Sequence, residues 1–198
     1  MTSDAPSVQA FVDRYLGDLR RTARALDPEP IARAVEWLRE VRDAGGTIFA
    51  AGNGGSATVA SNLVVDLVKC GSFGRSRRFR AIHLADSVST LTAFANDEGY
   101  ATVFAEPLRN FARPGDLLIA ISGSGESPNI LAAVEAAQDL GCRTLGLTSG
   151  RQGRLRQTAD LPLLVDSTHM GQLEDCFFVL SHALTYPFIE AVVDGAAD

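Results

Sequence analysis

Two stretches of the chain have the residue types of an anion-binding site. The glycine turn is residues 52–56, with the sequence GNGGS, and the serine turn is residues 122–127, with the sequence SGSGES. Each follows a short apolar run and precedes a helical pattern, so each is expected to lead from a strand into a helix. Such a turn places backbone N–H groups and serine hydroxyls beside the positive end of a helix dipole. The pair predicts a site for the phosphate of a small molecule.

A dinucleotide site is the main alternative for the glycine turn. Gly52, Gly54 and Ala57 satisfy the pattern G-x-G-x-x-A. That pattern requires an acidic residue about 20 residues further on, at the end of the next strand, and Asp86 comes too late to fill that role. Neither turn contains the lysine and hydroxyl residue of a P-loop. One such turn alone could be only a tight strand-to-helix connection without a ligand. Because the same pattern occurs twice, a phosphate site is favoured, and no nucleotide is expected.

Strands alternating with helices must position these turns. Helices are predicted over residues 7–25, 28–44, 56–70 (with Ser56 as N-cap), from 86 or 87 onward, and over 102–111, 128–140, 153–158 and 172–192. Strands are predicted over residues 47–51, 81–84, 116–121, 143–148 and 161–165. This order implies right-handed βαβ units. The predicted fold is α/β, a three-layer α/β/α sandwich with a parallel sheet of about five strands and an N-terminal helical extension.

Composition limits the classes of partner. The 198 residues are expected to form one domain, and the net charge of -6 argues against direct nucleic-acid binding. The three cysteines have no C-x-x-C spacing, which predicts neither a disulfide framework nor a zinc knuckle. No signal sequence or apolar stretch of about 20 residues is present, so a cytoplasmic protein without a membrane partner is expected.

The chain contains three histidines that could transfer protons near neutral pH. His182 lies in the last predicted helix among apolar residues, where a buried structural role is the alternative. His83 lies inside a predicted strand and is expected to be structural. His169 lies in a loop from which it could approach the site.

Several of these motifs together resemble the sugar isomerase (SIS) domain family. The resemblance rests on residues 52–56, Asn96-Asp97, residues 122–127 and the pair Glu174 and His182, and it extends over nearly the whole chain. It implies a flavodoxin-like sheet. It also implies a homotetramer in which the N-terminal helices, residues 1–45, form part of the interface.

The resemblance also implies roles for individual residues. The residues that match the family's substrate-binding positions are Asn53, Gly54, Gly55, Ser56, Asn96, Asp97, Ser122, Gly123, Ser124 and Ser127. Asp66 falls at the position of the catalytic base, where the family has glutamate, and His182 and Glu174 fall at the other catalytic positions. Zinc, where members bind it, would be held here by Asp66, Glu174 and His182, with Asn62 in place of a histidine ligand.

The implied activity is aldose–ketose isomerisation of a sugar phosphate, such as sedoheptulose 7-phosphate, through an enediol. That reaction needs a base, an acid and a firm hold on the phosphate. The alternative is a non-catalytic SIS module that binds a sugar phosphate or a protein partner. Which carboxylate is the partner of His182 stays open. On a helix Asp175 is nearly in line with His182, whereas Glu174, the residue that the resemblance implies, lies about 80° away.

Overall fold

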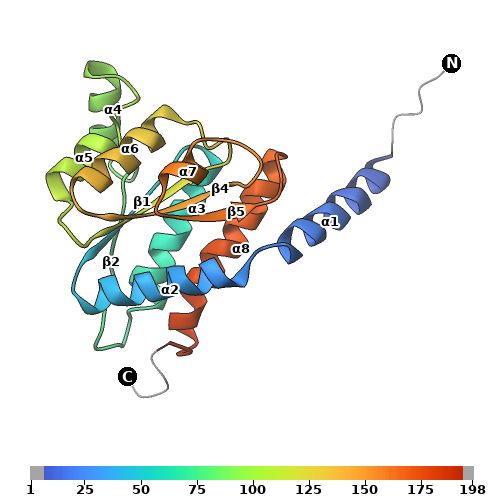
Figure 1. The fold of residues 1–198 in the computed structure, drawn as a ribbon, viewed down its shortest axis with the longest axis horizontal. Helices are drawn as coiled ribbons and strands as arrows, with labels where there is room; N and C mark the ends of the chain where they lie inside the picture. Colours follow the sequence, from blue (N-terminus) through green and yellow to red (C-terminus); the bar gives the residue numbers. More distant parts are fainter. Residues whose placement is uncertain (1–6, 194–198) are drawn as a thin grey trace.

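The computed structural model describes residues 7–193 and contains one sheet. Its strands are β1 (Thr47–Gly52), β2 (Arg80–His83), β3 (Leu117–Ser122), β4 (Arg143–Ser149) and β5 (Leu161–Val165). All neighbouring strands pair in parallel, in the order β2-β1-β3-β4-β5 (Figure 1). The predicted α/β class and five parallel strands are confirmed. The predicted single domain spans residues 1–198, of which 1–6 and 194–198 lie outside the described residues.

Helices cover both faces of the sheet. One face packs against α2 (Pro28–Asp43), α3 (Gly55–Val65) and α8 (Met170–Ile189). The other face packs against α4 (Val88–Asp97), α5 (Ala105–Phe111), α6 (Pro128–Asp139) and α7 (Leu155–Thr158). Successive residues of a strand point to opposite faces, so Ile48 and Ala50 enter the first core and Phe49 and Ala51 the second. Burial on both faces explains why the strands read as apolar runs.

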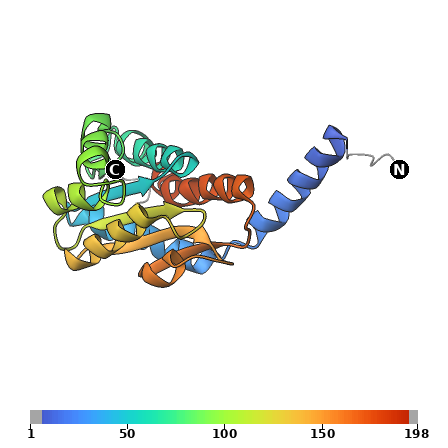
Figure 2. The ribbon, with the colours of Figure 1, turned by 90° about the horizontal axis from the view of Figure 1, so that it is seen from above.

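The first helix, α1 (Val8–Arg24), extends away from the rest of the protein (Figures 1 and 2). Ser7 caps it by accepting a hydrogen bond from the backbone N–H of Ala10. It contacts α8, and its residues Leu19 and Ala23 pack against the first core. Large apolar side chains on its N-terminal half are exposed, namely Val8, Phe11, Val12 and Leu16.

Several helix boundaries differ from those predicted. The helix before residue 111 begins at Ala105 rather than 102, and α8 begins at Met170 rather than 172, with His169 as its N-cap. The helix after the glycine turn is α-helical only to Val65 and continues as a π-helical segment, η1 (Asp66–Cys70). There the N–H of Gly71 donates to the carbonyl of Asp66 at 2.7 Å. Apolar periodicity does not distinguish this wider turn from an α-helical one.

The sheet order places both turns at one point. The chain steps from β1 to β2 on one side and then returns to place β3 on the other side of β1. Gly52 at the end of β1 pairs with Ile121 near the end of β3, so the glycine and serine turns leave the sheet side by side. Ligands of open α/β sheets bind at such a reversal of strand order, beyond the strands' carboxyl ends. Among the described residues, no helix is long and apolar enough to cross a membrane.

Candidate active site

The serine turn brings three hydroxyl groups together. Ser122 Oγ lies 3.1 Å from Ser127 Oγ and 3.5 Å from Ser124 Oγ. Ser122 is buried and also accepts a hydrogen bond from the N–H of Gly125, at 3.1 Å. Ser127 is the N-cap of α6, but its side chain makes no capping hydrogen bond. Because its hydroxyl is not used by the helix, it is available to an anion at the positive end of α6.

The loop between β4 and α7 supports the serine turn from behind. Thr148 Oγ1 donates to the carbonyl of Ser122 at 2.8 Å, and the N–H of Leu155 donates to the carbonyl of Gly125 at 3.0 Å. Gly125 and Gly153 both have positive φ, at 67° and 91°. A side chain on Gly153 would overlap the carbonyl of Ser124. The close backbone approach at this point therefore requires glycine.

The glycine turn starts α3 through its backbone rather than through a serine. The N-cap is Gly54, with φ 54° and ψ -124°, and no side chain caps the helix. Ser56 is buried within the first turn of α3, so its predicted role as N-cap is wrong. A serine is a common cap, but here a glycine conformation closes the turn two residues earlier. Gly52 is also required, because a Cβ there would lie 2.5 Å from the backbone of Ser56.

Asn53 connects the two turns. Its side-chain amide exchanges two hydrogen bonds with that of Asn129, both at 2.9 Å. The hydroxyl of Tyr100 donates to Asn53 Oδ1 at 3.0 Å. Asn129 is buried in the first turn of α6, directly after the serine turn. Sequence reasoning missed Asn129 and Tyr100, although an amide two residues after Ser127 was a visible signal for the former.

The helix α8 contacts both turns. A Cβ on Gly55 would overlap the carboxylate of Glu174, and a Cβ on Gly123 would lie 2.7 Å from Met170 Sδ. The absence of a side chain at each glycine therefore lets α8 approach. Glu174 lies against the glycine turn, and Met170 lies against the serine turn.

Further along, α3 and α8 run in the same direction and share polar side chains. Gly55 faces Glu174, and later Asp66 in η1 faces Thr185 and His182. Asp66 Oδ2 lies 3.9 Å from His182 Nε2 and accepts a hydrogen bond from Thr185 Oγ1 at 3.4 Å. The side chain of Asp66 is 14% exposed and that of His182 50% exposed. A largely covered carboxylate thus meets an accessible imidazole.

The partner of Asp175 is on α1. The hydroxyl of Tyr15 donates to Asp175 Oδ2 at 2.5 Å, and this bond, with burial, raises the pKa of Tyr15 to about 12. The Tyr15 ring also packs edge-on against His169. Asp175 therefore connects α8 to α1, whereas Glu174 turns toward the glycine turn. In the described part of the chain, the carboxylate recorded beside the imidazole of His182 is that of Asp66, with its Oδ2 3.9 Å from Nε2.

Asn96 and Asp97 lie at the exposed C-terminal end of α4. Their side chains bond to one another, with Asn96 Nδ2 donating to Asp97 Oδ1 at 2.7 Å. The segment that follows α4 reaches the glycine turn through Tyr100. Their predicted role in substrate binding stays a prediction.

The predicted zinc ligands do not form a metal site in the described chain. Glu174 lies at Gly55, about two helical turns before His182, and the amide nitrogen of Asn62 lies against both Asp66 and His182. Among residues 7–193, no three His, Cys, Asp or Glu side chains are gathered so that they could hold a metal ion. The donor set therefore does not fit a resident zinc ion.

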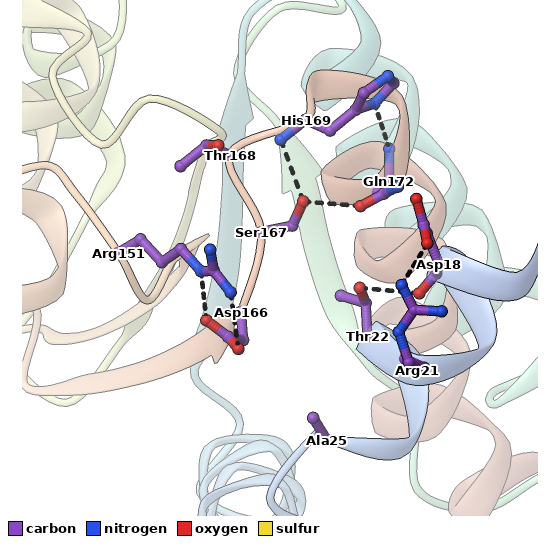
Figure 3. A pocket seen from close by; sticks show the side chains of 10 residues that line it. All are labelled: Asp18, Arg21, Thr22, Ala25, Arg151, Asp166, Ser167, Thr168, His169 and Gln172. Carbon is purple, nitrogen blue, oxygen red and sulfur yellow. Dashed lines mark hydrogen bonds and ion pairs between the residues drawn. The ribbon is translucent and has the colours of Figure 1, made fainter. Parts of the chain in front are cut away.

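The other two histidines have structural partners. His83 is buried, and its Nδ1 lies 2.8 Å from Asp86 Oδ1, in line with the structural role expected for it. His169 caps α8, with its Nδ1 accepting from the N–H of Gln172 at 3.4 Å. His169 lines a pocket of about 580 Å³ between α1 and the loops after β4 and β5 (Figure 3). None of the predicted site residues lines this pocket, which is formed by Asp18, Arg21, Thr22, Ala25, Arg151, Asp166, Ser167, Thr168, His169 and Gln172.

Several known proteins with similar sequences and structures are phosphoheptose isomerases. Residues 13–149 match the family described as the SIS domain. The chain is 36% identical over 172 residues to a phosphoheptose isomerase of Chlorobaculum parvum, covering 86% of this chain and 82% of that protein. Its structure matches the phosphoheptose isomerases of Neisseria gonorrhoeae and Francisella tularensis with a TM-score of 0.86 each, at 28% and 30% identity. Both matches cover 93% of this chain and 100% of the other. The chain therefore belongs to the SIS domain family, in which it groups with phosphoheptose isomerases.

Proposed function

We propose that this chain is a sugar-phosphate aldose–ketose isomerase that interconverts sedoheptulose 7-phosphate and D-glycero-D-manno-heptose 7-phosphate. The observation that carries the proposal is the position of α8. It contacts the glycine turn through Glu174, the serine turn through Met170 and the Asp66 carboxylate through Thr185. A phosphate site, a sugar site and proton-transfer groups are thereby held on one element. The similarity to phosphoheptose isomerases supports the choice of substrate.

The serine turn holds the phosphate in this proposal. Three hydroxyls and the N-terminal end of α6 provide donors to a dianion without a lysine. The glycine turn, through Asn53, Gly54 and Gly55, holds the sugar hydroxyls. Fixing the phosphate and the sugar hydroxyls orients the sugar for proton transfer, which lowers the entropy cost of the reaction.

Asp66 and His182 then move the protons. The Asp66 carboxylate takes a proton from C1 of the ketose while His182 donates one to the oxygen on C2, which gives the enediol. Asp66 then returns its proton to C2 while His182 takes a proton from the hydroxyl on C1, which gives the aldose and restores both side chains. Positioned acids and bases contribute roughly 10²- to 10⁴-fold each. Glu174 lies beside the glycine turn, where its carboxylate can accept a hydrogen bond from a sugar hydroxyl.

The proposal extends to assembly and location. Exposed apolar side chains on the projecting α1 support a homotetramer that buries them. Cys70, Cys142 and Cys176 are all free thiols, which supports action in the reducing cytoplasm.

The activity is tested by incubating the protein with ketose phosphates of five, six and seven carbons and following the aldose by NMR. We expect product from the seven-carbon ketose at the highest rate. If no ketose phosphate gives an aldose at enzyme concentrations equal to substrate, the isomerase proposal fails. A ligand-induced rise in melting temperature in that case would identify a non-catalytic module that binds sugar phosphates.

A further inference from the structure

Asn62 lies between the two side chains that transfer protons in the proposed reaction. Its Nδ2 atom is 3.2 Å from Asp66 Oδ2 and 3.4 Å from His182 Nε2. Asp66 and His182 are themselves 3.9 Å apart, between Oδ2 and Nε2. The amide therefore approaches each group more closely than they approach each other.

The chemistry of the three groups fixes the orientation of the amide. An ionised carboxylate only accepts hydrogen bonds, so the NH2 group of Asn62 must face Asp66. The same nitrogen lies 3.4 Å from His182 Nε2, and because an amide nitrogen only donates, a hydrogen bond between them requires a lone pair on this ring atom. The neutral ring then has its proton on Nδ1. A hydrogen bond from Asn62 would thereby favour the tautomer of His182 whose Nδ1–H is a donor.

The same orientation is unsuited to a metal ion. A zinc ligand must direct a lone pair at the ion, whereas Asn62 directs N–H groups into the space shared by Asp66 and His182. Thr185 contributes a further donor to Asp66 Oδ2, at 3.4 Å. The Thr185 hydroxyl has one proton and also lies 3.0 Å from the carbonyl of Ser181, so the amide of Asn62 is the closer dedicated donor to Asp66 Oδ2.

We propose that Asn62 is a positioning residue that holds Asp66 and His182 in place for proton transfer without a bound metal. The inference rests on the proposed isomerase function, for which it names the group that orients the acid and the base. Asn62 stands where zinc-binding members of the family have a histidine ligand, and the proposal gives this asparagine a role in proton transfer.

Kinetics of three variants test the positioning role. Asn62→Ala removes the amide, and Asn62→Asp keeps its shape but replaces the NH2 donor with an acceptor. Misplacement of reacting groups by about 1 Å costs on the order of a hundredfold, so kcat should fall by roughly 10- to 100-fold in both. KM should change little, because the phosphate is held at the serine turn. Asn110→Ala, an exposed asparagine on α5 at the other end of the sheet, is the matched control and should keep both constants.

Metal analysis tests the second half of the proposal. The protein as purified should contain substoichiometric zinc and keep its activity after treatment with a chelator. Asn62→His should gain one zinc per chain, because the introduced imidazole would join Asp66 and His182 as a third ligand. If chelation abolishes isomerisation by the unaltered protein and zinc restores it, the proposal is overturned while the isomerase function stands.

A third measurement does not depend on activity. With three histidines in the chain, ¹H–¹⁵N spectra of the imidazole rings can be assigned by substitution of each. The unaltered protein should show His182 with its proton on Nδ1, and Asn62→Ala should shift this ring toward the mixture seen in a free imidazole. An identical tautomer in both proteins would refute the role of Asn62. If no sugar phosphate is isomerised but the tautomer depends on Asn62, the proposed function fails and the positioning role survives.

Discussion

The hydroxyls of the serine turn owe their arrangement to residues that carry no polar side chain. Gly125 and Gly153 let two backbone segments meet, and this contact holds Ser124 next to Ser122. The serine and glycine composition predicted the phosphate site from sequence. The supporting contact with Gly153 was not predictable, because the two segments are joined only by the fold.

Gly153→Ala tests this support at the residue scale. The new Cβ would overlap the carbonyl of Ser124 and force the serine turn to move, so KM for the sugar phosphate should rise by roughly tenfold or more. Gly74→Ala is the control, since Gly74 also has positive φ, at 76°, but has nothing within 4 Å of the added Cβ. The positive φ alone should cost each variant roughly 1 kcal/mol of stability, and the overlap with Ser124 adds to this loss in Gly153→Ala. An equal rise in KM for both would contradict the role of Gly153.

At the scale of elements, the parallel pairing of α3 and α8 builds the site. The sequence predicted both helices but neither their pairing nor the π-helical segment at Asp66, because apolar periodicity reports which face is buried and not which helix covers it. For the same reason it left Glu174 and Asp175 as alternatives. In the structure, Glu174 lies against Gly55 and Asp175 bonds to Tyr15, and the carboxylate beside His182 is that of Asp66.

The stability that the contact between α1 and α8 contributes should decrease at alkaline pH. The pKa of Tyr15 is raised from 10.0 to about 12, because the protonated hydroxyl donates to Asp175. A raised pKa in the folded state means that this stabilisation is complete below about pH 10 and is lost as the pH rises through 12. Tyr15→Phe should therefore be less stable than the unaltered protein by about 1 kcal/mol at pH 8, and the difference should shrink toward pH 12.

Urea unfolding of both proteins at a series of pH values measures this difference. Asp175→Asn serves as the control that removes the acceptor charge while keeping the shape. A difference that stays constant from pH 8 to 12 would show that Tyr15 does not act through its hydroxyl proton.

At the scale of the whole molecule, the order of strands determines where the site lies. The alternating pattern predicted a parallel sheet of five strands, but the order β2-β1-β3-β4-β5 could not be read from it, because each crossover can place its strand on either side. The observed order brings the ends of β1 and β3 together. Two turns separated by about 70 residues of sequence thus lie side by side.

The exposed face of α1 predicts the behaviour of the assembly. Phe11 is 46% exposed on the projecting helix, and Phe11→Asp should prevent association because it would bury a charge against apolar side chains. Light scattering should give about 84 kDa for the unaltered protein, four times the chain mass of 21.0 kDa, and a smaller species for the variant. The control is Phe73→Asp, in the turn after η1, where the phenylalanine is 81% exposed. This variant should leave the mass unchanged. A single-chain mass for the unaltered protein would exclude the tetramer.

The most direct test of the proposed function is isomerisation in D2O by the unaltered protein and by Asp66→Asn. Asparagine keeps the shape of the side chain but removes its basicity. With sedoheptulose 7-phosphate, the unaltered protein should form the aldose and incorporate deuterium at the carbons that exchange protons. The Asp66→Asn variant should lose roughly 100-fold or more in both, with an unchanged melting temperature. Product formation and deuterium incorporation by Asp66→Asn at rates near those of the unaltered protein would contradict proton transfer at Asp66.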